Sequence, residues 1–231
     1  MKKLMRKIFT FILSLSFATT AVFASDASMA EEEAGPISYN VGFASEYWYR
    51  GVYQSESSVS FGADYEANNF YAGTWWADVD QGVEYDIYAG YGFSIGGADL
   101  YIGATGYYYS DNFDDDYEEM NAGIAFGPIA IDTSHGEYKK GGRTDGNTKD
   151  HNYSFTSIAY DMSGMGLPLT LTYGEWGGSK LKGDVTTLSY GTSVAGADVG
   201  LEVGKNSSDI TAATTSRADT TYAIFTLGYS F

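Results

Sequence analysis

The segment "TTYAIFTLGYSF" (Thr220–Phe231) shows the pattern on which the fold prediction depends. Apolar side chains occupy alternate positions, and small or polar residues fall between them. A period of two is typical of a β-strand with one apolar face. Because the last residues of a chain usually fray unless they are held, we expect this terminal strand to be pinned by pairing with another strand. The apolar set is Ala223, Phe225, Leu227, Tyr229 and Phe231.

The same alternation recurs along the chain and predicts twelve strands. In two segments, 70–78 and 152–161, both registers carry apolar residues, so the pattern does not assign their faces. The predicted strands occupy residues 37–50, 59–65, 70–78, 83–91, 100–104, 120–126, 129–131, 152–161, 167–173, 188–194, 199–203 and 220–231.

The connections alternate between two lengths. Tight turns rich in Gly and Asn lie near 67–69, 95–97, 127–128, 163–166 and 195–197, and mostly longer polar links lie at 51–57, 78–82, 111–116, 139–149, 177–183 and 206–218. This layout is typical of outer-membrane barrels. A soluble barrel or sandwich is the alternative, but its exposed face should be rich in Lys and Glu, whereas the face opposite the apolar one here carries Gly, Ser, Thr and Asp.

We therefore predict an all-β fold: a transmembrane antiparallel β-barrel of about 12 strands, in an up-and-down meander over residues 37–231. Counts of ten or fourteen strands are the alternatives. Both termini are expected at the periplasmic end and the long loops outside, so the predicted location is the cell outer membrane. In a closed barrel the last strand pairs with the first, which leaves no free edge.

The amino-terminal residues predict export. The segment "MKKLMRKIFTFILSLSFATTAVFA" (residues 1–24) has basic residues, then an apolar run, then small residues, as a signal peptide does, and the acidic residues 25–36 are expected to be flexible. Removing residues 1–24 takes the formal net charge from -17 to -21, so nucleic acid is not an expected partner. The chain has no cysteine, which excludes disulfides and thiol chemistry. The expected partners are outer-membrane lipids, small solutes and the barrel-assembly machinery, with Phe231 as the assembly signal; the oligomeric state stays open.

Acidic residues dominate the register that should face the lumen. A lumen lined with one sign of charge enriches counter-ions, so cations and neutral solutes should pass more readily than anions such as uronates. The alternative is that some acids pair with Arg50, Lys205 or other bases and only stiffen the interior. The pore-lining candidates are Glu46, Asp64, Glu84, Asp86, Asp99, Asp132, Asp198 and Glu202.

Aromatic residues share this register and have two possible roles. They could stack on a sugar or a base, or they could fill the barrel and narrow it to small solutes, which is the favoured interpretation. The lumen aromatic candidates are Trp48, Tyr88, Tyr101, Tyr107 and Tyr109.

Neither a cofactor nor a metal is predicted. The acidic segment "DNFDDDYEE" (Asp111–Glu119) has many oxygen ligands but lacks the Gly and the spacing of a calcium-binding EF-hand loop. Catalysis is not predicted either. Ser134 and His135 are adjacent on a predicted strand and so point to opposite faces, and the chain has no GxSxG motif. A lipid-modifying enzyme and a purely structural barrel remain the alternatives from other classes.

Three segments resemble the TorF family of proposed outer-membrane porins. "ASEYWYRGVYQS" (Ala44–Ser55) is similar to that family's ASDYxYRGxSQ stretch, with Glu46 in place of Asp and Tyr53 in place of Ser. "NFYAGTWWADVD" (Asn69–Asp80) and "VEYDIYAGY" (Val83–Tyr91) resemble two further landmarks. The resemblance implies a barrel and passive transport, and it supplies neither a substrate nor catalytic residues. We therefore expect a diffusion channel, or alternatively a channel selective for nucleosides or neutral sugars.

Overall fold

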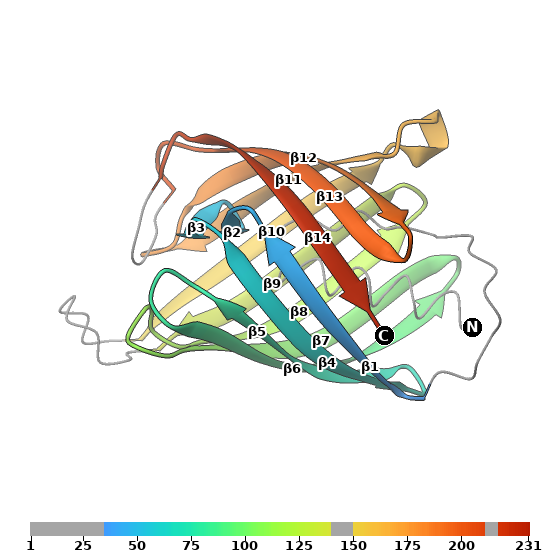
Figure 1. Cartoon of the computed structure of the whole chain (residues 1–231), viewed down its shortest axis with the longest axis horizontal. Helices are drawn as coiled ribbons and strands as arrows, with labels where there is room; N and C mark the ends of the chain where they lie inside the picture. The colour runs from blue at the N-terminus through green and yellow to red at the C-terminus, as the bar shows by residue number, and fades with distance from the viewer. Residues whose placement is uncertain (1–34, 140–149, 211–216) are drawn as a thin grey trace.

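The computed structural model describes residues 35–139, 150–210 and 217–231, and in them twelve antiparallel strands close into one barrel (Figure 1). Residues 1–24 and 25–34, where the sequence predicts a signal peptide and most of a flexible segment, lie outside the described residues. The predicted twelve-stranded meander is confirmed. The barrel strands are β1 (Ile37–Ala44), β4 (Ser58–Ala67), β5 (Phe70–Asp78), β6 (Val83–Ile95), β7 (Ala98–Tyr109), β8 (Tyr117–Phe126), β9 (Ile129–Tyr138), β10 (His151–Asp161), β11 (Leu169–Gly178), β12 (Gly183–Val194), β13 (Ala197–Asn206) and β14 (Thr221–Ser230).

The first and last strands close the ring. β14 pairs with β1 in a register that places Tyr229 opposite Val41. Beyond the paired segment, the amide of Tyr39 donates to the carbonyl oxygen of Phe231 at 2.8 Å, and the amide of Phe231 donates back at 3.0 Å. The terminal strand is therefore held by backbone hydrogen bonds, as expected.

The period of two separates an apolar outer face from a polar inner one. Large apolar side chains of the outward register are exposed, for example Ile102 at 57% and Val203 at 53%. In the two segments whose faces the sequence does not assign, β5 turns Tyr71 and Trp75 inward, and β10 turns Tyr153 and Phe155 inward. An apolar outer surface around a polar interior is the inverse of a soluble barrel and is typical of a barrel in lipid.

The two ends of the barrel differ as predicted. Turns of a few residues join strands at the end of the barrel where β1 begins and β14 ends, and one of these turns contains the short 3-10 helix η1 (Ser163–Met165) (Figure 1). The β12–β13 turn uses Ala195 and Gly196 at φ of 53° and 87°, which suits a tight hairpin. Across the described residues no helix is long and apolar enough to cross a bilayer.

One predicted strand and one predicted loop are wrong. Residues 37–50 are not a single strand, because β1 ends at Ala44, and residues 51–57 are not an external loop. Instead β2 (Tyr47–Tyr49) and β3 (Val52–Ser55) form a separate two-stranded sheet, which we call the inner hairpin. β1 and β4 pair directly with each other, so the inner hairpin between them has no place in the barrel wall and folds into the lumen instead (Figure 1).

Candidate functional site

The inner hairpin crosses the lumen and contacts distant parts of the wall. Tyr47, Trp48 and Tyr53 are at most 3% exposed, although they lie in a connection between strands. Only a segment inside the ring could reach so many strands. Its contacts are Tyr47 to Glu84 on β6, Tyr49 to Tyr107 on β7, Arg50 to Glu119 on β8 and Ser134 on β9, Arg50 to Trp176 on β11, Gly51 to Asn206 on β13 and Trp48 to Tyr222 on β14.

Arg50, at the tip of the inner hairpin, makes a buried two-pronged ion pair with Glu119. Its two terminal nitrogens donate to the two carboxylate oxygens at 2.9 and 2.8 Å, and one of them also donates to the Ser134 hydroxyl at 3.0 Å. The guanidinium carbon lies 4.8 Å from the ring centre of Phe155 and 5.4 Å from that of Trp176. Burial by itself would lower the pKa of Arg50, but the Glu119 carboxylate outweighs it and holds the pKa well above its usual value.

The turn of the hairpin is fixed through its backbone. Trp176 donates its indole N–H to the carbonyl oxygen of Arg50 at 2.9 Å, and Asn206 donates its amide to that of Gly51 at 2.9 Å. Gly51 has φ of +80°, and a Cβ there would lie 2.7 Å from Cβ of Val185. Both the backbone angle and the close approach to β12 therefore require glycine.

One arrangement of side chains recurs on the lumen wall. A tyrosine lies over a glycine of the next strand, and its hydroxyl donates a hydrogen bond to an acid one strand further on. Gly73 on β5 is paired on one side with Tyr88 on β6 and on the other with Asp64 on β4. The Tyr88 hydroxyl donates to Asp64 across that glycine. A Cβ on Gly73 would lie 2.6 Å from the Tyr88 ring, so the arrangement requires glycine.

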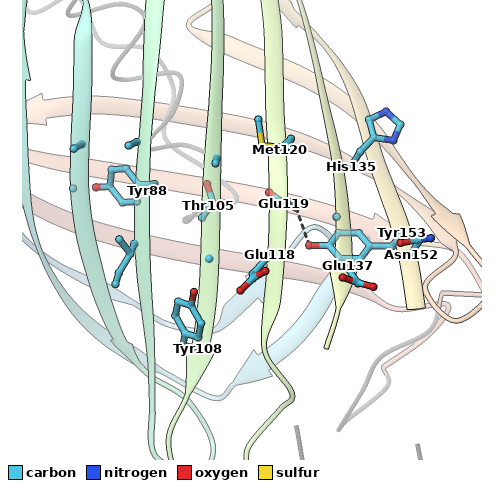
Figure 2. A pocket seen from close by; sticks show the side chains of 17 residues that line it. Tyr88, Thr105, Tyr108, Glu118, Glu119, Met120, His135, Glu137, Asn152 and Tyr153 are labelled. Atoms are coloured by element: carbon cyan, nitrogen blue, oxygen red, sulfur yellow. Dashed lines mark hydrogen bonds between the residues drawn. The ribbon is translucent and has the colours of Figure 1, made fainter. Parts of the chain in front are cut away.

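We call each such row of three paired residues a tyrosine–glycine–acid rung. The hydroxyl of Tyr101 donates to Asp132 at 2.6 Å across Gly123, and that of Tyr153 donates to Glu119 at 3.0 Å. Figure 2 shows the last of these pairs. Because the ring crosses the width of a whole strand, each rung ties three neighbouring strands together. The rungs are Tyr88–Gly73–Asp64, Tyr101–Gly123–Asp132 and Tyr153–Gly136–Glu119.

Three lumen acids have carboxylate oxygens without a hydrogen-bond partner among the described residues. Glu84 accepts a hydrogen bond from the Tyr47 hydroxyl at 2.9 Å on one oxygen, while its other oxygen has no partner among the described residues. Both oxygens of Asp86 are likewise without a partner there, and the side chain is 0% exposed. Glu202, on the opposite part of the wall, accepts from Ser189 at 2.9 Å and has one oxygen without a partner. A buried carboxylate of this kind is costly unless something compensates its charge.

The structure divides the predicted pore-lining residues into three groups. Asp64, Glu84, Asp86, Asp132 and Glu202 are buried in the lumen on barrel strands. Asp99 and Asp198 share the inward register but lie half-buried near the short turns, bonded to serines at 2.8 and 2.5 Å. Glu46 lies in the connection between β1 and β2 and accepts from Trp48 at 2.7 Å, so its assignment to a wall strand is wrong.

Two further predictions are wrong: the element in which Trp48 lies, and the direction in which Lys205 points. Tyr88, Tyr101 and Tyr107 are buried on barrel strands, but Trp48 belongs to the inner hairpin, where it stacks on Tyr222 with ring centres 4.0 Å apart. Lys205 is not a lumen base. Its side chain points outward, is 49% exposed and pairs with Asp219 at 2.6 Å. Gly204 and Asn206 on either side of it are buried, so Lys205 lies on the outward register of β13.

Glu119 is not among the residues that the sequence pattern places in the lumen, yet it accepts more hydrogen bonds than any other buried acid of the described residues. The pattern predicts it as the end of an external acidic segment, but β8 begins at Tyr117 and turns Glu119 inward. Besides Arg50, Glu119 accepts from Tyr107, Asn121 and Tyr153 at 2.7 to 3.0 Å. The alternation of Met120, Ala122, Ile124 and Phe126 contained the signal, since continuing it backward by one residue places Glu119 in the lumen.

A hollow lies on the wall of β5 to β10. A cavity of about 920 Å³ runs along β5 to β10, where small residues such as Ala89 and Ala104 leave room (Figure 2). Exposed outward side chains, among them Met120 and His135, line much of it.

Ser134 is 1% exposed in the lumen, whereas His135 is exposed on the outer face, so the prediction that these neighbours point apart is confirmed. Among the described residues no group of three or more His, Cys, Asp or Glu could hold a metal ion.

Comparisons with known proteins agree with this geometry. A family model described as "Bacterial protein of unknown function (Gcw_chp)" matches residues 30–228. No curated protein matches the chain. Among solved structures, the KdgM porin has a TM-score of 0.51 at 9% identity, covering 84% of this chain and 97% of its own. A membrane protein from work on in-meso crystallization has a TM-score of 0.55 at 12% identity, covering 84% and 83%. At these identities the likeness shows the fold alone.

Proposed function

This chain belongs to the Gcw_chp family of bacterial proteins of unknown function, and from its porin-like barrel we propose an outer-membrane channel for the passive diffusion of small solutes. The outer-membrane location, the TorF resemblance and the exclusion of an enzymatic role are parts of the same proposal. The observation that supports it most strongly is the charge of the lumen: among the described residues, Arg50 is the one buried base, it is paired with Glu119, and several further buried acids have no basic partner.

The charge of the lumen sets the expected selectivity. Asp64, Asp132 and Glu202 are buried on wall strands with hydroxyl or amide donors, not with basic side chains. In a narrow lumen of low dielectric constant, uncompensated carboxylates attract cations and repel anions. The channel therefore favours cations and neutral solutes, and it disfavours acidic sugars such as uronates.

The inner hairpin sets the expected size of the conducted solute. The pocket between the inner hairpin and the wall, lined by Tyr49, Tyr107 and Trp176 among others, holds about 30 Å³. That volume admits water-sized species only. With the hairpin in place we therefore expect the channel to conduct weakly, and larger solutes would require the hairpin to move.

Planar-bilayer recording of the refolded chain tests this function. We expect small unitary currents and a reversal potential of cation sign in a salt gradient. Replacing Glu84 by Gln together with Asp86 by Asn should weaken the cation preference, most at low salt, where screening is weakest. The matched control, Glu56→Gln with Asp80→Asn, removes two exposed acids of the loops and should leave the preference near that of the parent. Anion preference, or no unitary conductance with or without the hairpin, contradicts the proposal.

A further inference from the structure

Glu84 and Asp86 form one compact acidic position on β6. They lie two residues apart, so their side chains share the lumen face, and they are 1% and 0% exposed. The cross-strand neighbours of Asp86 are the aromatic residues Trp75 and Tyr107, and those of Glu84 are Ala77 and Tyr109. Tyr47 of the inner hairpin covers the position from the lumen side and donates to Glu84.

The unpartnered oxygens distinguish this position from Asp64 and Glu119, and Glu202 has one such oxygen without a second acid beside it. Asp64 and Glu119 are as deeply buried, but each has both carboxylate oxygens hydrogen-bonded. Asp86 has neither, although it is enclosed on all sides. Native structures satisfy buried polar groups almost without exception, so two adjacent exceptions point to a ligand.

The surrounding charges define the ligand's sign. Two of the charged groups that act on Asp86 are further acids, Glu84 and Glu119. Arg50, the base buried in this lumen, has its terminal nitrogens committed to Glu119 and Ser134. Nothing basic is therefore paired with Asp86 in the described part of the chain, and a mobile cation would supply the missing charge.

We propose that Glu84 and Asp86 bind a small monovalent cation in the lumen, beneath the inner hairpin. Asp86 offers two oxygens, and Glu84 offers the one that Tyr47 does not occupy. Calcium sites usually supply several carboxylates and magnesium demands a near-octahedral ligand set, whereas no group of three acids gathers here among the described residues. Close packing by Tyr47 and Trp75, each 1% exposed, excludes bulky organic cations. The site deepens the proposed function, on which it rests for the route by which the ion arrives.

Thermal melting of the detergent-folded chain tests the site without any current measurement. At equal ionic strength, potassium chloride should raise the melting temperature above that in N-methylglucamine chloride, whose cation is too large to enter. For a chain of this size we expect a rise of roughly 2 to 4 °C when potassium exceeds its dissociation constant several-fold. Asp86→Asn should melt at the same temperature in both salts, whereas the exposed loop control Asp80→Asn should keep the parent's difference.

A second variant and a direct probe guard against a folding failure. Glu84→Gln keeps an oxygen that can accept from Tyr47 and should reduce the salt difference even if Asp86→Asn does not fold. Crystals soaked in rubidium chloride should show an anomalous peak between Glu84 and Asp86. An equal melting temperature of the parent in both salts, or the absence of a peak there, overturns the site. Cation-selective conductance with no such stabilisation would refute this site alone, and stabilisation without conductance would refute the channel alone.

Discussion

Several side chains in this lumen are held by buried polar partners. The pair of Arg50 and Glu119 is the clearest case, because both side chains are nearly inaccessible and Glu119 receives further donors from three other residues. Breaking a buried pair by removing one charge leaves the other without compensation, and that cost exceeds the gain from forming the pair.

Glu119→Gln should therefore lower the free energy of unfolding by about 3 to 5 kcal/mol. Urea titration of the lipid-folded barrel, followed by tryptophan fluorescence, measures the change. Glu137→Gln is the matched control, since it breaks the exposed pair with Lys139 and should change stability little. Equal stability of Glu119→Gln and the control would show that the inner hairpin is not anchored through Arg50.

The tyrosine–glycine–acid rungs make a second prediction at this scale. Gly73→Ala should cost about 1 to 3 kcal/mol of unfolding free energy, because the added Cβ meets the Tyr88 ring and displaces it from Asp64. Gly228→Ala places a Cβ no closer than 3.9 Å to any neighbour, so it should be neutral or slightly stabilising. The same titration compares the two, and a neutral Gly73→Ala would refute the steric role of that glycine.

The inner hairpin is a pair of strands that does not belong to the barrel wall. It is anchored at its tip through Arg50 and Gly51 and at its sides by aromatic stacking, such as Trp48 on Tyr222. The barrel closes without it, since β1 and β4 pair over eight positions on their own. The hairpin therefore occupies the lumen, and its strands take no part in the strand pairing that closes the ring.

Replacing residues 46–56 with a short Gly-Ser linker should leave the barrel folded and increase its unitary conductance several-fold. Heat-modifiable migration on a gel verifies the fold, and planar-bilayer recording measures the current. The control replaces residues 163–166, the turn around η1 at the other end, and should keep the parent's conductance. An unchanged conductance after removal of the hairpin would mean that another part of the lumen limits flow.

The whole molecule combines an apolar outer face with a tightly packed acidic interior. Exposed apolar side chains such as Ile102, Met120 and Val203 need a lipid or detergent partner. We therefore expect the chain without residues 1–24 to refold only with detergent or lipid, to show β-rich circular dichroism and to migrate differently on a gel before and after boiling. A chain that stays folded and monomeric without detergent would contradict the membrane assignment.

The sequence alone determined the strands, the faces and the two ends of the barrel. These follow from local rules: alternation fixes which side of a strand each residue occupies, and turn residues fix where strands end. Five of the eight predicted pore-lining acids are buried on the wall for this reason, among them Glu84 and Asp86. In β5 and β10 the same rule gave no answer, because both registers carry apolar side chains.

Only the tertiary structure decided what lies opposite each residue across the lumen. The sequence of the segment Tyr47–Ser55 is compatible with part of a wall strand followed by a loop. Its inward course follows from the direct pairing of β1 with β4, because that segment connects these two strands. Arg50 meets Glu119 across 69 positions of the chain, and each rung joins three strands through one glycine. Such contacts depend on ring closure and register over the whole barrel, and a period of two carries no information about either.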